Sequence, residues 1–116
     1  MGFTISYDMC LRELGDTSAA IEKIIDKAEQ LGWEYERAIG DGFNGVVIET
    51  GNDECETISI VFECLNCEGF VKYLGIDEDF IWKIFNILWL LKPYMERLDV
   101  IDDYGLWYEF VSQIDR

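Results

Sequence analysis

Hydrophobic and polar residues alternate at the start of the chain, where Phe3, Ile5 and Tyr7 are each followed by a polar residue. A period of two residues is typical of a β-strand that buries one face. The same alternation or a short apolar run occurs at 33–39, 46–48, 57–63, 70–73 and 98–101. We therefore expect a sheet of several short strands, with a turn around Asn66 and Gly69.

Two segments have the spacing of amphipathic helices. In residues 17–31, Ile21, Ile24 and Ala28 share one face, Asp16 to Ser18 offer N-cap side chains, and a glycine follows the end. The second helix is expected over 79–91, because acidic residues at its start suit the positive end of the helix dipole. It carries two apolar stripes, one of them with Trp82 and Trp89.

The order strand, helix, several strands, helix, strand predicts a single α+β domain over residues 1–116. We expect a mostly antiparallel sheet with the two helices packed on one face, ferredoxin-like or related. The glycine-rich segment 40–45 matches the spacing G-x-G-x-x-G. Because 46–48 continues as a strand and opens no helix, we interpret this segment as a hairpin loop and not as a nucleotide site.

The composition of the chain disfavours several classes of partner and of catalysis. The chain has 24 Asp and Glu against 9 Lys and Arg, a net charge of -15, and no histidine. That charge disfavours nucleic acid and anionic membrane surfaces as partners. The missing histidine removes Ser-His-Asp and Cys-His catalysis. We therefore expect no catalytic residue, metal or cofactor.

Cys64 and Cys67 form a C-x-x-C pair flanked by glutamates. A zinc site needs two further ligands, and a redox pair would start a helix, so we interpret both residues as structural thiols. The apolar stretch around 84–91 is shorter than the about 20 residues needed to cross a bilayer. With no visible targeting signal and with unpaired thiols, we expect a cytoplasmic protein.

The acidic residues have two interpretations. They form either a solvated surface that keeps the protein soluble or a docking surface for a basic protein. Aromatic residues, which often anchor interfaces, occur among them. The candidate partner-binding residues are Asp53, Glu54, Glu56, Asp99, Asp102, Asp103, Tyr104 and Trp107.

The second apolar stripe of helix 79–91 also needs a cover. Either the C-terminal segment 106–111 covers Trp82 and Trp89, or a partner or second copy of the chain does. In the second case the two tryptophans mark an oligomer or partner face.

Several segments resemble a group of small uncharacterised bacterial α+β proteins of unknown function. The resemblance lies in residues 2–7, 28–33, 55–62 and 98–107, which read GFTISY, AEQLGW, CETISIVF and LDVIDDYGLW. It implies an α+β, ferredoxin-like sheet and no established activity.

Three hypotheses follow. The first is a non-enzymatic binding protein, such as an immunity or antitoxin-like inhibitor of a basic toxin, whose carboxylates imitate a polyanion. The second is an enzyme or small-ligand domain that uses Asp102, Asp103 and Glu109 as acid and base. The third is a homo-oligomeric structural protein, for example a homodimer joined through Trp82 and Trp89.

Overall fold

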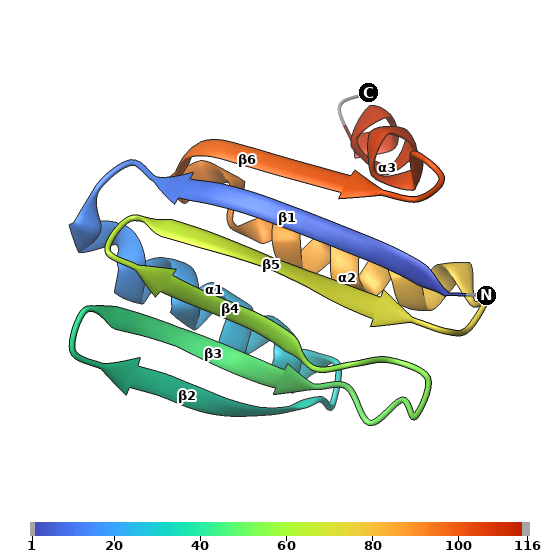
Figure 1. Ribbon diagram of the computed structural model, residues 1–116, viewed down its shortest axis with the longest axis horizontal. Helices are drawn as coiled ribbons and strands as arrows, with labels where there is room; N and C mark the ends of the chain where they lie inside the picture. Colours follow the sequence, from blue (N-terminus) through green and yellow to red (C-terminus); the bar gives the residue numbers. More distant parts are fainter. Residues whose placement is uncertain (1, 115–116) are drawn as a thin grey trace.

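The computed structural model describes residues 2–114, which form an antiparallel sheet and three α-helices (Figure 1). This confirms the predicted α+β class. None of the helices in that part of the chain is long and apolar enough to cross a membrane. The elements are, in chain order, β1 (Phe3–Leu11), η1 (Leu14–Asp16), α1 (Thr17–Gln30), β2 (Glu34–Gly40), β3 (Phe43–Glu49), β4 (Ile58–Glu63), β5 (Asn66–Tyr73), α2 (Glu78–Leu90), η2 (Lys92–Tyr94), β6 (Met95–Asp102) and α3 (Leu106–Ile114).

The six strands lie in the order β2-β3-β4-β5-β1-β6, and every neighbouring pair is antiparallel. If the β2–β3 hairpin is left out, the elements from β1 to β6 follow the order β-α-β-β-α-β, which is that of ferredoxin-like folds. The hairpin extends this framework at one edge of the sheet, and α3 extends it at the other.

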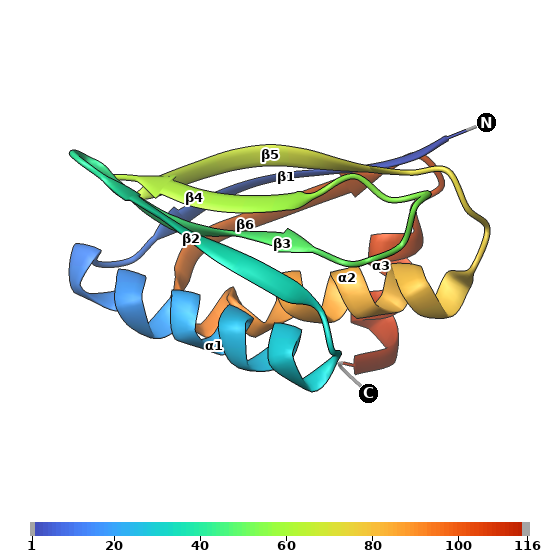
Figure 2. The same ribbon diagram turned by 90° about the horizontal axis from the view of Figure 1, so that it is seen from below.

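Two helices cover one face of the sheet. α1 and α2 lie side by side beneath it, and α3 stands at the β6 edge against α2 (Figure 2). The core forms between the sheet and these two helices. It includes alternate residues of β1 together with Ile21 and Ile24 from α1 and Ile84, Ile87 and Leu88 from α2, all fully buried. Burial of these side chains is the main force that holds the layers together.

The ends of α1 and α2 lie within one residue of the ends predicted from the sequence, but one predicted turn was misplaced. The β4–β5 turn lies at Cys64 and Leu65, whereas Asn66 and Gly69 belong to β5. The reason is that Cys64 adopts the left-handed conformation, with φ 55°, without the glycine that usually signals it. The glycine-rich segment is a hairpin as expected, with a tight turn in which Gly42 has φ 83°.

One aromatic side chain bridges three strands. The buried Tyr7 of β1 lies opposite Gly69 of β5, and its hydroxyl donates a hydrogen bond to the Ser59 carbonyl on β4. A Cβ at residue 69 would come within 2.7 Å of the Tyr7 hydroxyl oxygen. Glycine is therefore required there, because only a bare backbone lets the ring cross β5.

The Tyr7 bridge crosses between β5 and β4, the neighbouring strands with the least regular backbone pairing in the sheet. β4 is in register with β5 only at Glu63 and Asn66, next to their turn. At the far end of β5, its outer edge pairs instead with the loop before β4, where the Leu74 amide donates to the Glu54 carbonyl at 2.7 Å. Between these two ends, the Tyr7 side chain supplies a link from β1 to β4.

We predict that Tyr7→Phe lowers the free energy of unfolding by about 0.5–1.5 kcal/mol, because the partly buried hydrogen bond from the Tyr7 hydroxyl to the Ser59 carbonyl is lost. Tyr35→Phe is the matched control, since the Tyr35 hydroxyl donates to Glu29 at the exposed surface. Urea unfolding measures both variants. A loss no larger for Tyr7→Phe than for Tyr35→Phe would contradict the structural role of the bridge.

Tyr7→Phe should also change how the free energy of unfolding depends on pH. Burial raises the pKa of Tyr7 above its ordinary value of 10.0. Above that pH the unfolded chain loses the phenolic proton while the folded protein keeps it, so stability falls as pH rises. Tyr7→Phe removes this contribution, and its unfolding free energy should therefore decline less steeply than that of the wild type in alkaline buffer.

Candidate functional site

The face of the sheet opposite α1 and α2 carries no helix among residues 2–114 (Figure 2). In β1 the odd-numbered residues from Phe3 to Leu11 are buried, which turns Ser6 and Asp8 toward this open face. The register of the neighbouring strands then decides which side chains join them. Strand pairing therefore builds this surface from segments that are far apart in sequence.

Three carboxylates form one row across adjacent strands. Asp8 on β1 lies opposite Glu68 on β5 and opposite Asp99 on β6. Arg97 partly neutralises the row, with N–O distances of 3.1 Å to Asp8 and 2.8 Å to Asp99. The hydrogen bonds to these two aspartates raise the pKa of Arg97. Glu68 has no ion-pair partner within the described chain, so the row keeps a negative balance.

The neighbouring row across the same three strands carries two apolar side chains. Ser6 lies between Phe70 on β5 and Ile101 on β6. Phe70 is 57% exposed and Ile101 is 71% exposed, and both border a shallow hollow of about 780 Å³ over the three strands. Large exposed hydrophobic side chains beside charges are typical of interaction surfaces. We call this surface the acidic sheet face and define it by Ser6, Asp8, Glu68, Phe70, Asp99 and Ile101.

The acidic residues predicted from the sequence separate into different roles. Asp99 belongs to the acidic sheet face. Asp102 holds the start of α3, because its carboxylate accepts hydrogen bonds from the amides of Tyr104 at 2.9 Å, Leu106 at 2.9 Å and Trp107 at 2.8 Å. Asp103 accepts a hydrogen bond from the Thr4 amide at 2.8 Å. Asp102 and Asp103 therefore fix the β6–α3 turn.

Asp53, Glu54 and Glu56 lie on the exposed loop between β3 and β4. This loop pairs with the end of β5, and β1 separates β5 from β6. Three strand spacings, roughly 14 Å, therefore lie between the loop and the β6–α3 turn. The two acidic groups predicted as one docking site stand at the same end of the sheet but do not form one cluster (Figure 1).

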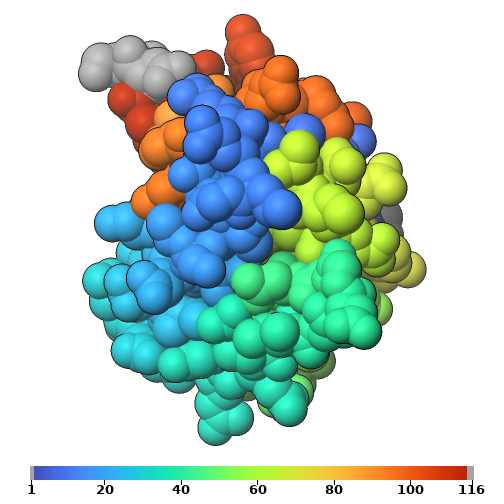
Figure 3. Space-filling view, turned by 90° about the vertical axis from the view of Figure 1, so that its left-hand side faces the viewer, coloured from blue at the N-terminus to red at the C-terminus, as the bar shows by residue number. Residues whose placement is uncertain are grey.

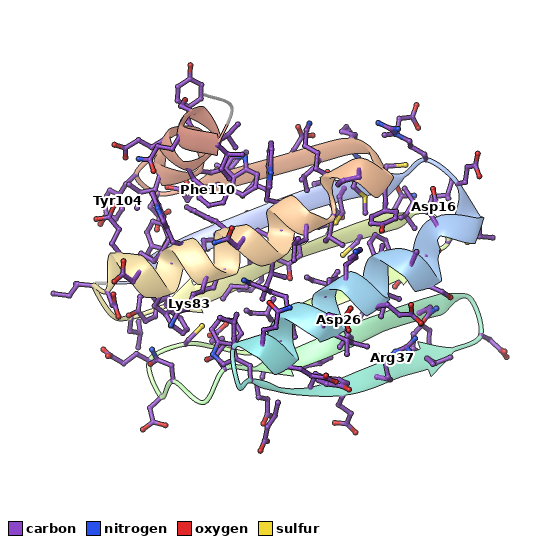
Figure 4. The ribbon with its side chains drawn as sticks, turned by 180° about the vertical axis from the view of Figure 1, so that it is seen from behind. Asp16, Asp26, Arg37, Lys83, Tyr104 and Phe110 are labelled. Atoms are coloured by element: carbon purple, nitrogen blue, oxygen red, sulfur yellow. The ribbon has the colours of Figure 1, made fainter. Side chains whose placement is uncertain are left out.

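The predicted aromatic anchors are engaged within the chain. The exposed Tyr104 stacks on Phe3 with ring centroids 5.7 Å apart. Trp107 belongs to a cluster in which Phe85 is 5.3 Å and Phe110 is 5.5 Å from it. Phe110 points from α3 toward α2 (Figure 4). Trp107 therefore fastens α3 to the body of the protein.

The face of α2 that carries Trp82 and Trp89 is covered by α3. Phe110 lies 5.6 Å from Trp82 and 6.5 Å from Trp89, measured between ring centroids, and both tryptophans are half-buried. Of the two covers that the sequence left open, the structure shows the C-terminal segment. A third helix forms there, which the sequence analysis described only as an apolar tail.

The carboxylates considered for acid–base chemistry either accept backbone amides or lie on the exposed surface. Both oxygens of Asp102 accept backbone amides, and Glu109 lies on the exposed surface of α3. In the C-x-x-C pair, Cys64 is exposed at the turn while Cys67 is buried, and burial raises the pKa of the Cys67 thiol to about 11. Residues 2–114 contain no group of three or more Cys, Asp or Glu side chains arranged to hold a metal ion.

Sequence reasoning missed Asp8, Glu68, Phe70 and Ile101 as site residues. The alternation in β1 already indicated that Ser6 and Asp8 turn away from the core. The missing information was strand order, because only the pairing of β1 with both β5 and β6 brings these residues together. A comparison of the sequence with known protein families and with curated proteins finds no match.

We predict that Asp102→Ala detaches the start of α3 and lowers the unfolding free energy by about 1–2 kcal/mol, the cost of losing a strong helix cap. The near-ultraviolet circular dichroism of the tryptophan cluster should weaken with it. Asp53→Ala, an exposed aspartate of the β3–β4 loop, is the control and should change neither signal. Unchanged stability and spectrum in Asp102→Ala would refute the capping role.

Proposed function

We propose that this protein is a non-enzymatic binding domain that docks a basic protein on the acidic sheet face. The observation that carries the proposal is the row of three carboxylates beside the exposed Phe70 and Ile101 on the uncovered side of the sheet. Charge of one sign steers an oppositely charged partner, and exposed apolar side chains provide contacts that slow its release.

The net charge of -15 supports the same conclusion. A field of this sign attracts basic proteins over a Debye length of about 8 Å at physiological ionic strength and repels nucleic acid and anionic lipids. The outer face of the sheet offers a surface whose backbone is held in place by the core beneath it. Such a surface suits a preformed protein partner.

More specifically, we propose an immunity or antitoxin-like inhibitor of a basic toxin such as a nuclease. A nuclease cleft binds the phosphate backbone, and a row of carboxylates on a rigid sheet supplies negative charge at regular strand spacing. All four cysteines are free thiols, which supports a reducing cytoplasm as the location.

Isosteric amide substitutions test the location of the docking surface. The probe is an octa-arginine peptide, titrated by calorimetry and by amide chemical shifts. We expect Asp8→Asn with Glu68→Gln to weaken binding about tenfold, because charge-assisted hydrogen bonds are lost. The matched control is Glu22→Gln with Asp26→Asn, which removes the same charge from the exposed surface of α1.

In the wild type, the peptide should shift the amide signals of Ser6, Phe70 and Ile101 most strongly, and the shifts should fade as salt is added. The control pair should weaken binding less than threefold, the size of a general charge effect. Equal losses in the two pairs, or shifts spread evenly over the molecule, would show that the acidic sheet face is only a solvated surface.

A further inference from the structure

The charges on α1 are sorted by side. Glu22, Asp26 and Glu29 follow one another at helical spacing, and Glu29 accepts a hydrogen bond from Tyr35 of β2 at 2.9 Å. Lys23 and Lys27 form the adjacent stripe, because each directly follows one of these acidic residues in the sequence and is therefore rotated from it around the helix axis. Lys23 faces the end of α2, where it borders a groove. α1 thus turns its acidic stripe toward β2 and its basic stripe toward α2.

This groove has a volume of about 390 Å³ and lies between α1, the end of α2 and η2. Figure 3 shows α1, in blue to cyan, beside the orange residues of this region. None of its lining residues is acidic, although the chain has 24 Asp and Glu. The lining residues are Lys23, Trp89, Leu90, Lys92, Pro93 and Tyr94.

Two ammonium groups border the groove from different elements. Lys23 comes from α1, and Lys92 comes from η2, where its Nζ lies 5.7 Å from the centroid of the Trp89 ring. Within residues 2–114 neither lysine forms an ion pair. Both positive charges are therefore available to a ligand, in a molecule whose other surfaces are mostly negative.

The walls of the groove are aromatic and fixed. Trp89 is half-buried and packs against Trp107 of α3, with ring centroids 6.1 Å apart. The Tyr94 amide donates to the Leu91 carbonyl at 3.0 Å, and Pro93 restricts the same turn. A ligand would therefore find rings already in place, which reduces the entropy cost of binding.

We propose that this groove binds a small aromatic anion, such as an aryl carboxylate. Its aromatic ring would pack against Trp89 and Tyr94, and its carboxylate would accept hydrogen bonds from Lys23 and Lys92. The volume falls within the range of about 300–1,000 Å³ that is usual for small-ligand sites. This site shares no residue with the acidic sheet face, so a test of one proposal does not decide the other.

Two probes of the same shape separate charge from apolar contact. Naphthalene-1-acetate carries the carboxylate, and naphthalene-1-acetamide is its neutral counterpart. We expect the acetate to bind at least about tenfold more tightly, because charge-assisted hydrogen bonds are stronger than neutral ones. Calorimetry measures both affinities, and quenching of tryptophan fluorescence reports contact with Trp89.

Substitutions of the groove residues identify which groups bind the two probes. Lys23→Gln with Lys92→Gln should bring the two affinities together, while Lys72→Gln with Lys83→Gln removes equal charge outside the groove and should preserve the difference. Trp89→Leu should weaken both probes, and the exposed lysine variants test the site even if that substitution disturbs folding. Equal affinities of the acetate and the amide, equal losses in the two lysine pairs, or binding of neither probe would overturn the proposal.

Discussion

The sheet depends on a single aromatic bridge. β4 and β5 are in register only beside their turn, so the central part of the sheet is joined by the Tyr7 ring, which crosses Gly69 to reach the Ser59 carbonyl. The Tyr7 side chain thus links β1 to β4 where the backbone ladder between β4 and β5 is incomplete, and loss of this partly buried hydrogen bond lowers stability. The Tyr7 bridge, the pairing of the loop before β4 with β5, and the shared core together keep the β2-β3-β4 half beside the β5-β1-β6 half.

Covering the sheet on one side has a direct electrostatic consequence. β1, β3, β4 and β5 bury most of their apolar side chains on the side of α1 and α2. Most polar side chains are left to the opposite face, where the pairing of β1 with β5 and β6 brings Glu68 and Asp99 beside Asp8. On the helix side, the packing of α1 against β2 and α2 sorts its charges into separate stripes. The molecule therefore has an acidic face and a small basic groove, although its composition suggests only a uniform negative charge.

The fold was largely predictable, and the site was not. Residues 17–31 and 79–91 read as helices because their apolar spacing agrees with the following Gly32 and Pro93. Asp77 caps the second helix through the Asp79 amide, whereas Asp16 makes no side-chain cap bond at the start of the first. The third helix was missed because Asp102, four residues before its first residue, starts it, and no local pattern shows that this carboxylate collects three amides. The acidic sheet face was missed for another reason: Asp8, Glu68 and Asp99 are brought together only by strand order, which the short strands do not encode locally. The sequence analysis instead assigned two separate acidic groups, one with Glu54 and one with Asp103, to one docking surface, and β5 and β1 keep these groups apart.

The β2–β3 hairpin lies outside both surfaces. In the sheet it pairs with the β-α-β-β-α-β framework through β4, and its Val46 and Ile48 side chains lie in the core. Tyr35 also donates a hydrogen bond to Glu29 of α1. Neither the acidic sheet face nor the basic groove uses any of the hairpin's residues. Changes in the length or sequence of the hairpin turn would therefore leave both surfaces in place. The turn, at residues 41–42, is exposed and remote from both, which makes it a natural insertion point for a fluorescent label or a second domain.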